Sequence, residues 1–244
     1  VAQAMGGGMS ITGVNQQHMV RAGIPIGDLG GGMFGVMGIL AALYERERSG
    51  QGQHVDISML DCQISMLNYM ATMHFLSGND PYPIGNSHFV HVPYDTFTCS
   101  DGFIVIAIIT DNFWQNLKQV VHAPAFDDVK YDSQPGRWED REMITSTLNA
   151  LLRVNTCAFW LSQLEDKRIP CAPVNSLSQA LSDTQVLHRN MVVDLHHPNG
   201  RSTKGPGNPI KLSRNADEIF SPAPTLGQHT LSLIHISEPT RRSA

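Results

Sequence analysis

One carboxylate is notable for the residues that surround it. Asp28 lies just before a predicted helix and is followed by Gly30, Gly31 and Gly32. The N–H groups of a helix N-terminus favour an ionised carboxylate, and glycines let backbone donors and a bulky substrate approach. An aspartate at such a position is most often a helix N-cap, worth about 1 kcal/mol. It is also suited to act as a nucleophile that carries an acyl group, and the local sequence leaves both roles open.

The other reactive side chains do not form a metal or disulfide pattern. The four cysteines are scattered, with no CxxC pair: Cys62, Cys99, Cys157 and Cys171. We interpret them as buried thiols of a reduced compartment, and we expect no metal site. Two histidine pairs, His88 with His91 and His196 with His197, have no accompanying carboxylate motif. We interpret these as ordinary polar histidines.

The composition is that of an ordinary soluble globular protein. The 244 residues are 41% hydrophobic and 16% charged, with a formal net charge of −5. The chain has no basic stripe, which argues against nucleic-acid binding. We find no apolar run approaching the roughly 20 residues that cross a bilayer, and no secretory signal at the N-terminus. We therefore expect a cytoplasmic protein that does not bind membranes.

The element after Asp28 is a helix by its periodicity. Met33, Val36, Met37, Leu40 and Tyr44 recur at helical spacing, and the helix is predicted to end at Gly50. Small residues along it predict close packing against a neighbour; they are Gly35, Gly38, Ala41 and Ala42.

The remaining pattern predicts alternating helices, strands and one long irregular segment. His54–Met59 alternates as a strand does, and residues 77–94 are irregular and rich in proline. Thr96–Ile109 predicts a hairpin with its turn at residues 100–102. Helices are predicted at residues 61–76, 111–121 with Asp111 as cap, 139–152, 156–167 and 176–187. Residues 191–212 are predicted to form strands and turns.

Both ends of the chain are unusual. Val1 is not an initiator methionine and leads almost directly into Gly6–Gly8, so we expect sequence upstream of it. Residues 231–241 agree with the translation of a transposase-type sequencing adapter. We therefore expect residues 231–244 to be non-native and exclude them from the prediction of the fold.

Several blocks, in order, resemble the class III CoA-transferase family, which includes formyl-CoA transferase, carnitine CoA-transferase and α-methylacyl-CoA racemase. The resemblance covers about residues 1–230. Its blocks are Gly7–Gly13 (GGMSITG), Gly27–Asp28, Gly38–Leu43 (GILAAL), Arg46–Gln53 (RERSGQGQ), Val55–Asp61 (VDISMLD), Gly85–Asn86, Pro93–Tyr94, Asp101–Gly102, Ile169–Asn175 (IPCAPVN) and Leu226–Thr230 (LGQHT).

The resemblance implies an α/β fold: part of a large Rossmann-like domain plus a smaller α+β domain. It implies that the N-terminal nucleotide-binding half is missing, so that this chain is a C-terminal fragment. We expect residues 1–78 to end the first segment of the large domain, 79–95 to be a linker, 96–186 to form the small domain, and 187–230 to return to the large one. The family also implies an interlocked homodimer.

The resemblance implies a role for four residues. Asp28 would be the nucleophile that forms a mixed anhydride with the donor acyl group and then an aspartyl-CoA thioester. Gln3, Ala4 and Met59 match positions near coenzyme A. The formyl-CoA transferase branch also has a glycine-rich loop that shields the intermediate. Here the compact Phe97–Gly102 hairpin replaces it, and we expect residues 86–91 to line the acyl site instead.

Two other functions remain open. The sequence from Asp28 to Gly32 also resembles the racemase branch, in which an aspartate and an upstream histidine exchange the α-proton of an acyl-CoA. The second alternative is a non-catalytic, truncated dimerisation fragment that binds coenzyme A poorly. We favour a transferase that moves coenzyme A from an acyl-CoA donor to a small carboxylic acid, because the blocks at 85–110 and 169–175 resemble transferase sequences more closely.

Overall fold

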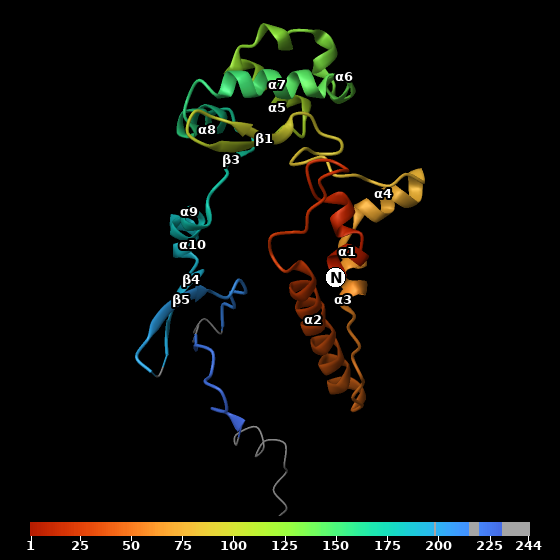
Figure 1. The fold of residues 1–244 in the computed structure, drawn as a ribbon, viewed down its shortest axis with the longest axis vertical. Coiled ribbons are helices and arrows are strands. Elements are labelled where there is room, and N and C mark those ends of the chain that lie inside the picture. The colour runs from red at the N-terminus through yellow and green to blue at the C-terminus, as the bar shows by residue number, and fades with distance from the viewer. Residues whose placement is uncertain (198, 215–219, 231–244) are drawn as a thin grey trace, which may run out of the picture. The chain divides into compact units, whose positions relative to one another are not determined.

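The computed structural model describes residues 1–197, 199–214 and 220–230. It is a mixed helix and sheet structure (Figure 1). The chain divides into two compact units, residues 1–174 and 175–244. The adapter-like residues 231–244 lie outside the described residues. The domain boundaries expected at 79–95 and 96–186 stay predictions, as does the Rossmann-like part of the large domain.

The first unit begins with helices. They are α1 (Ala2–Met5), the 3-10 helix η1 (Gly8–Ile11), α2 (Ile26–Ser49), α3 (Met59–Met66) and α4 (Tyr69–Ser77). The predicted stop of α2 is confirmed, because Gly50 caps it with φ of 72°, a left-handed conformation that glycine adopts without strain. The helix predicted over 61–76 is interrupted at Asn68, so it forms two helices, α3 and α4.

The start of α2 corrects the expected position of Asp28. The N-cap is Pro25, and Asp28 is the third residue of the helix, inside its first turn. No side chain caps this terminus, so the interpretation of Asp28 as an N-cap is wrong. Gly27 and the glycines at 30–32 do not delay the start of the helix, because Pro25 has a φ of −75° that suits entry into it.

Glycines on α2 let its neighbours pack closely, as predicted at Gly38. A Cβ added to Gly38 would lie 2.9 Å from Val55 Cγ1, and one on Gly30 would lie 2.6 Å from Met66 Cε. At Gly35 nothing lies within 4 Å. Figure 1 shows α3 and residues 51–58 running along α2. The larger apolar residues predicted as a stripe on the same helix are exposed: Met33, Val36, Met37, Leu40 and Tyr44.

The strand predicted at His54–Met59 is wrong. Residues 51–58 have no regular structure, and α3 already begins at Met59. The alternating apolar residues of this segment, Val55 and Ile57, pack against Gly38 of α2. Among the described residues no strand pairs with this segment, because both sheets are formed elsewhere. Residues 51–58 are therefore an extended segment whose successive side chains point to opposite sides, but which forms no hydrogen-bonded ladder with a strand.

The core of the first unit lies between a small sheet and three helices. The antiparallel sheet has the order β1 (Tyr94–Thr98), β2 (Phe103–Ala107) and β3 (Cys171–Pro173), which confirms the predicted hairpin. The helices are α5 (Asp111–Val121), α7 (Arg141–Leu152) and α8 (Cys157–Asp166), with α6 (Gln134–Glu139) and the 3-10 helices η2 (Pro124–Phe126) and η3 (Val129–Asp132) between them. Alternate β2 residues, Ile104 and Ile106, are fully buried, as are Ile144 and Leu148 of α7.

The helix caps of this region follow ordinary sequence chemistry, with one correction. Thr110, not Asp111, caps α5, since its side chain accepts from the Phe113 N–H. Asp111 lies in the first turn and instead pairs with Arg137. Thr156 caps α8 in the same way as Thr110 caps α5.

The second unit holds short helices and a two-stranded sheet. Ser176 forms a capping box with Gln179 at the start of α9 (Leu177–Ser182), and α10 (Thr184–His188) follows. Strands β4 (Val192–His196) and β5 (Ser202–Pro206) pair antiparallel, which confirms the strand-and-turn prediction for this region.

Helix α2 is long and apolar enough to cross a membrane by length and composition. An 18-residue window has a mean hydropathy of 1.6, and 11% of that window is buried. The expectation that no segment reaches this criterion is therefore wrong. Core helices of soluble proteins meet the same criterion, so it does not by itself place α2 in a bilayer.

Candidate functional site

Asp28 presents its carboxylate at the surface of the first turn of α2. The residue is exposed, whereas Gly27 and Gly30 beside it are buried. The N–H groups of Gly27 and Asp28 have no acceptor among the described residues, while the Leu29 N–H bonds to Pro25 O. Two free donors at a helix N-terminus stabilise negative charge on an oxygen nearby. The arrangement therefore suits both an ionised carboxylate and an oxyanion formed from it.

The other three predicted site residues come from the elements that pack around this turn. Ala2 of α1 lies 3.7 Å from the position of a Cβ on Gly27, which places α1, with Gln3 and Ala4, beside Asp28. Met59 begins α3, and its Cγ lies 3.2 Å from a Cβ position on Gly31, one turn after Asp28. The structure thus brings α1, Asp28 and Met59 to one end of α2.

Of these three residues, Gln3 already uses its side chain in a hydrogen bond, whereas Ala4 and Met59 are exposed to solvent. Gln3 Oε1 accepts from the Ala22 N–H at 3.0 Å, so it braces the loop that leads into α2. Ala4 and Met59 are exposed. Met59 starts a helix and is 49% exposed, so it does not belong to a strand as the alternation of His54–Met59 predicted. The coenzyme A contacts of all three stay predictions.

Gln63 lies under the same turn and was not singled out from the sequence. It is buried, packs against Gly6 and Gly8, and places Nε2 3.2 Å from a Cβ position on Gly27. Its Nε2 has no hydrogen-bond partner among the described residues. A single glutamine on a helix gives no sequence signal for this role, because only the packing of three segments buries it.

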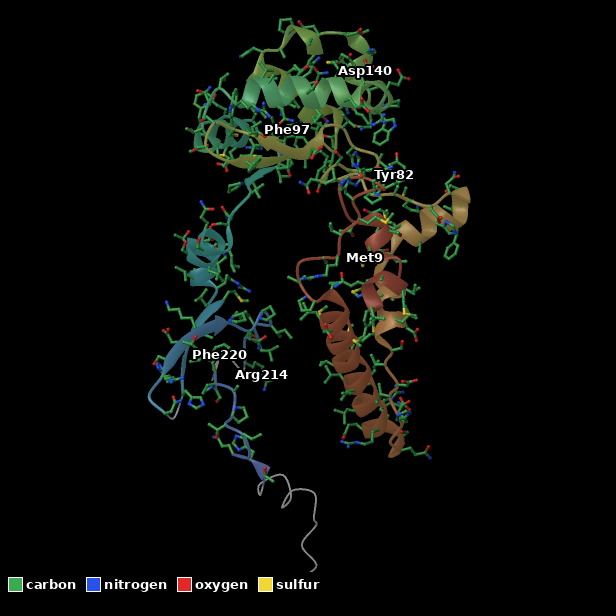
Figure 2. The ribbon with its side chains drawn as sticks, viewed as in Figure 1. Met9, Tyr82, Phe97, Asp140, Arg214 and Phe220 are labelled. Carbon is green, nitrogen blue, oxygen red and sulfur yellow. The ribbon has the colours of Figure 1, made fainter. Side chains whose placement is uncertain are left out.

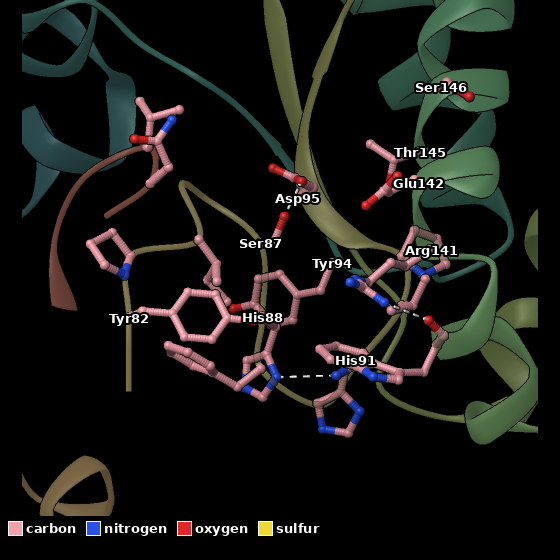
Figure 3. Close-up of a pocket in the computed structure, with 18 of the residues that line it drawn as sticks. Tyr82, Ser87, His88, His91, Tyr94, Asp95, Arg141, Glu142, Thr145 and Ser146 are labelled. Atoms are coloured by element: carbon pink, nitrogen blue, oxygen red, sulfur yellow. Dashed lines mark hydrogen bonds between the residues drawn. The ribbon is translucent and has the colours of Figure 1, made fainter. Parts of the chain in front are cut away.

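A separate cavity of about 840 Å³ lies farther along the first unit (Figure 3). Its walls are the loop 14–17, Met73, the segment 82–95, Trp138 of α6 and one side of α7. The volume falls in the range of small-molecule sites, about 300–1,000 Å³. Ser87, His88, Phe89 and His91 line it, so the segment expected to line an acyl site does border a cavity. Asp28 is not among the lining residues.

The neutral ring of His88 is held in one tautomer by its own loop. Its Nδ1 accepts from the Val90 N–H at 3.0 Å and the His91 N–H at 3.2 Å. Because an N–H group only donates, the proton of neutral His88 is on Nε2. Burial, with His91 as the smaller cause, lowers the pKa of His88. The ring stacks on Tyr94 at 5.1 Å.

Arg137 holds the cavity wall in place. Its fully buried guanidinium donates to Val92 O at 2.8 Å and to Tyr131 O at 2.7 Å. The same group pairs with Asp111 at 2.8 Å and lies over the Trp114 ring. It therefore ties the end of segment 82–95 to the helices that cover the core.

The cysteines are free thiols, as expected, although only Cys62 and Cys99 are buried. Burial is the largest cause that raises the pKa of Cys99, Cys157 and Cys171. Thiols that stay protonated are poor nucleophiles. No group of three metal-ligating side chains occurs in the part of the chain that the structure describes.

The sequence matches CoA-transferase family III over residues 1–230. Succinyl-CoA:glutarate CoA-transferase of Mus musculus is 32% identical over 96% of this chain and 54% of its own length. Succinyl-CoA:mesaconate CoA-transferase of Haloarcula hispanica is 32% identical over 96% of this chain and 59% of its own length. A crystal structure of a CaiB/BaiF family protein from Brucella suis superimposes with a TM-score of 0.82 at 29% identity, covering 96% of this chain and 61% of that one. The chain thus spans little more than half the length of these relatives.

Proposed function

The chain belongs to CoA-transferase family III, and we propose that the full-length protein transfers coenzyme A from an acyl-CoA donor to a carboxylic acid, with Asp28 as the covalent carrier. Membership in the family supports CoA transfer in general. One observation supports the choice of Asp28: an exposed carboxylate in the first turn of α2, beside two N–H donors without acceptors.

The transfer proceeds in four substitutions at carbonyl carbons. An Asp28 oxygen attacks the thioester carbonyl of the donor, which forms a mixed anhydride and releases the coenzyme A thiolate. The thiolate then attacks the aspartyl carbonyl, which forms an aspartyl-CoA thioester and releases the donor acid as a carboxylate. Each step exchanges one anionic leaving group for one anionic nucleophile, so no net proton moves.

The second half of the cycle repeats these steps with the acceptor. Its carboxylate attacks the aspartyl-CoA thioester, and the thiolate released then attacks the acceptor carbonyl of the new anhydride. The product is the acceptor's CoA thioester, with the Asp28 carboxylate regenerated. Oxyanions form at the aspartyl carbonyl in these steps, and the N–H groups of Gly27 and Asp28, which are free in the same turn, would be the donors that stabilise them.

The substrates that we propose are an acyl-CoA and a small dicarboxylic acid. The two transferases compared above are named for succinyl-CoA with glutarate and with mesaconate. These names also favour transfer over the racemase alternative. We further propose that the full-length protein is an interlocked homodimer in the cytoplasm, in which Gln3, Ala4 and Met59 contact coenzyme A.

Asp28→Ala tests the assignment in the full-length protein, with Asp61→Ala as the matched control. Asp61 is also an exposed first-turn aspartate, of α3. Loss of a covalent carrier is expected to lower the rate of succinyl-CoA:glutarate exchange at least about 1,000-fold. The Asp61 variant should retain the rate. Full turnover by Asp28→Ala would remove Asp28 from the mechanism.

A further inference from the structure

The cavity beside segment 82–95 contains a cation without a counter-ion. The Arg141 guanidinium lines the cavity and lies 5.0 Å above the Trp138 ring. Its one hydrogen bond, from Nη1, goes to Trp138 O at 3.3 Å. Within the described ranges, no carboxylate lies within 4.0 Å of it. An arginine held by stacking keeps most of its five N–H donors for a ligand, and its planar fork matches a carboxylate.

A second unused donor faces the same space. With His88 Nδ1 occupied by two backbone N–H groups, its Nε2 carries the proton and has no acceptor among the residues that the structure describes. His91, also on the wall, has a buried Nδ1 without a partner. Figure 3 shows the Arg141 side chain extending from α7 and the rings of His88 and His91 from segment 82–95, all three of which line the cavity.

The acidic groups of the cavity limit the charge of a ligand. Asp95 is already engaged, because it accepts from Ser87 Oγ and from the Thr96 N–H. Glu142 follows Arg141 on α7 and also lines the cavity. In Figure 3 it lies toward Asp95, away from the histidines. A ligand with one free carboxylate fits Arg141, whereas a second free carboxylate would meet Glu142.

The remaining wall is aromatic and apolar. Tyr82, Tyr94 and Trp138 contribute rings, and Val92 and Pro93 add apolar surface. Such a surface suits a short methylene chain.

We propose that this cavity binds the free carboxylate of a dicarboxylic acyl group, with Arg141 as the anion-binding residue and His88 Nε2–H as the second donor. The proposal rests on the proposed function, because the other carboxyl group of the acid would be the one esterified to coenzyme A. It makes Arg141 a determinant of specificity for dicarboxylic over monocarboxylic acids. The bound group is the acyl part of the CoA thioester, which carries one free carboxylate.

Calorimetry on the full-length protein carrying Asp28→Ala tests binding without chemistry. Glutaryl-CoA and valeryl-CoA have equal acyl chain lengths and differ by the one free carboxylate. Arg141→Gln should weaken the binding of glutaryl-CoA about tenfold or more and that of valeryl-CoA little. His88→Asn keeps an acceptor for the loop N–H groups but loses the Nε2 donor, and should weaken the binding of glutaryl-CoA less than Arg141→Gln does.

Arg153→Gln is the matched control, because Arg153 is exposed at the other end of α7 and does not line the cavity. Equal affinity of the Arg141→Gln and Arg153→Gln proteins for glutaryl-CoA would overturn the proposal. So would tighter binding of glutaryl-CoA after Arg141→Gln, which would show that the guanidinium does not hold the carboxylate. Neither result depends on turnover, so failure of this proposal is distinguishable from failure of the Asp28 assignment.

Discussion

At the scale of single residues, Arg137 joins several distant parts of the first unit through the hydrogen bonds and the ion pair of one side chain. Its guanidinium is fully buried and serves the carbonyls of Val92 and Tyr131 as well as Asp111. Removing it leaves buried carbonyl oxygens without donors. Each lost bond costs about 1 kcal/mol or more, so Arg137→Met should lower the free energy of unfolding by about 2–4 kcal/mol.

Urea unfolding checks this expectation against Arg153→Met. Arg153 is exposed, so its substitution should change the free energy of unfolding by less than about 0.5 kcal/mol. Equal stability of the two variants would show that the Arg137 contacts contribute little.

His88 links stability to pH. Burial lowers its pKa below the ordinary 6.5, so the unfolded chain takes up a proton at a higher pH than the folded chain does. Stability from this residue is therefore present above pH 6.5 and is lost as the pH falls below that value. In His88→Asn the urea midpoint should fall less between pH 7 and pH 5 than in the unmodified protein. Parallel pH profiles would contradict this account of His88.

At the scale of elements, α2 offers a matched pair of glycines. Gly35 has nothing within 4 Å of a Cβ position, whereas at Gly38 the Cβ would lie 2.9 Å from Val55 Cγ1. Gly35→Ala should stabilise the helix by about 0.5–1 kcal/mol, the usual difference in propensity. Gly38→Ala should gain less or destabilise, because Val55 must move. Thermal unfolding compares them, and a larger gain at Gly38 would show that residues 51–58 do not pack there.

Elements whose ends are set by turn or cap residues in the neighbouring sequence were predictable. The hairpin around residues 100–102 and the Gly50 stop follow from turn and cap chemistry. The strand at 54–59 was predicted wrongly because alternation gives the orientation of side chains but not a pairing partner. The first turn of α2 was missed because glycines next to Asp28 obscure a helix that Pro25 begins.

At the scale of the whole molecule, the sequence identified the family, whereas the role of Asp28 stays a proposal and its position inside the first turn of α2 was not predicted. The order of the sequence motifs was sufficient to identify the family, and the match over residues 1–230 confirms that identification. Gln63 and Arg137 carry no motif, since each acquires its role from contacts with residues far away in the chain. Arg141 contacts the nearby Trp138, and it acquires its role from the cavity that it lines together with segment 82–95. Segment 86–91 was expected to line a ligand site, and it does border the cavity in Figure 3. Figure 2 shows the side chain of Asp140, whose carboxylate accepts from Tyr131 Oη at 2.6 Å.

Covalent transfer requires that Asp28 itself carries coenzyme A during turnover. Mass spectrometry of the full-length protein, incubated with succinyl-CoA alone and without an acceptor acid, can detect this intermediate. We expect a coenzyme A adduct on the peptide that contains Asp28, which hydroxylamine releases and which Asp28→Ala lacks. An adduct on another residue, or turnover with no adduct on Asp28 under conditions that trap the thioester, would contradict it.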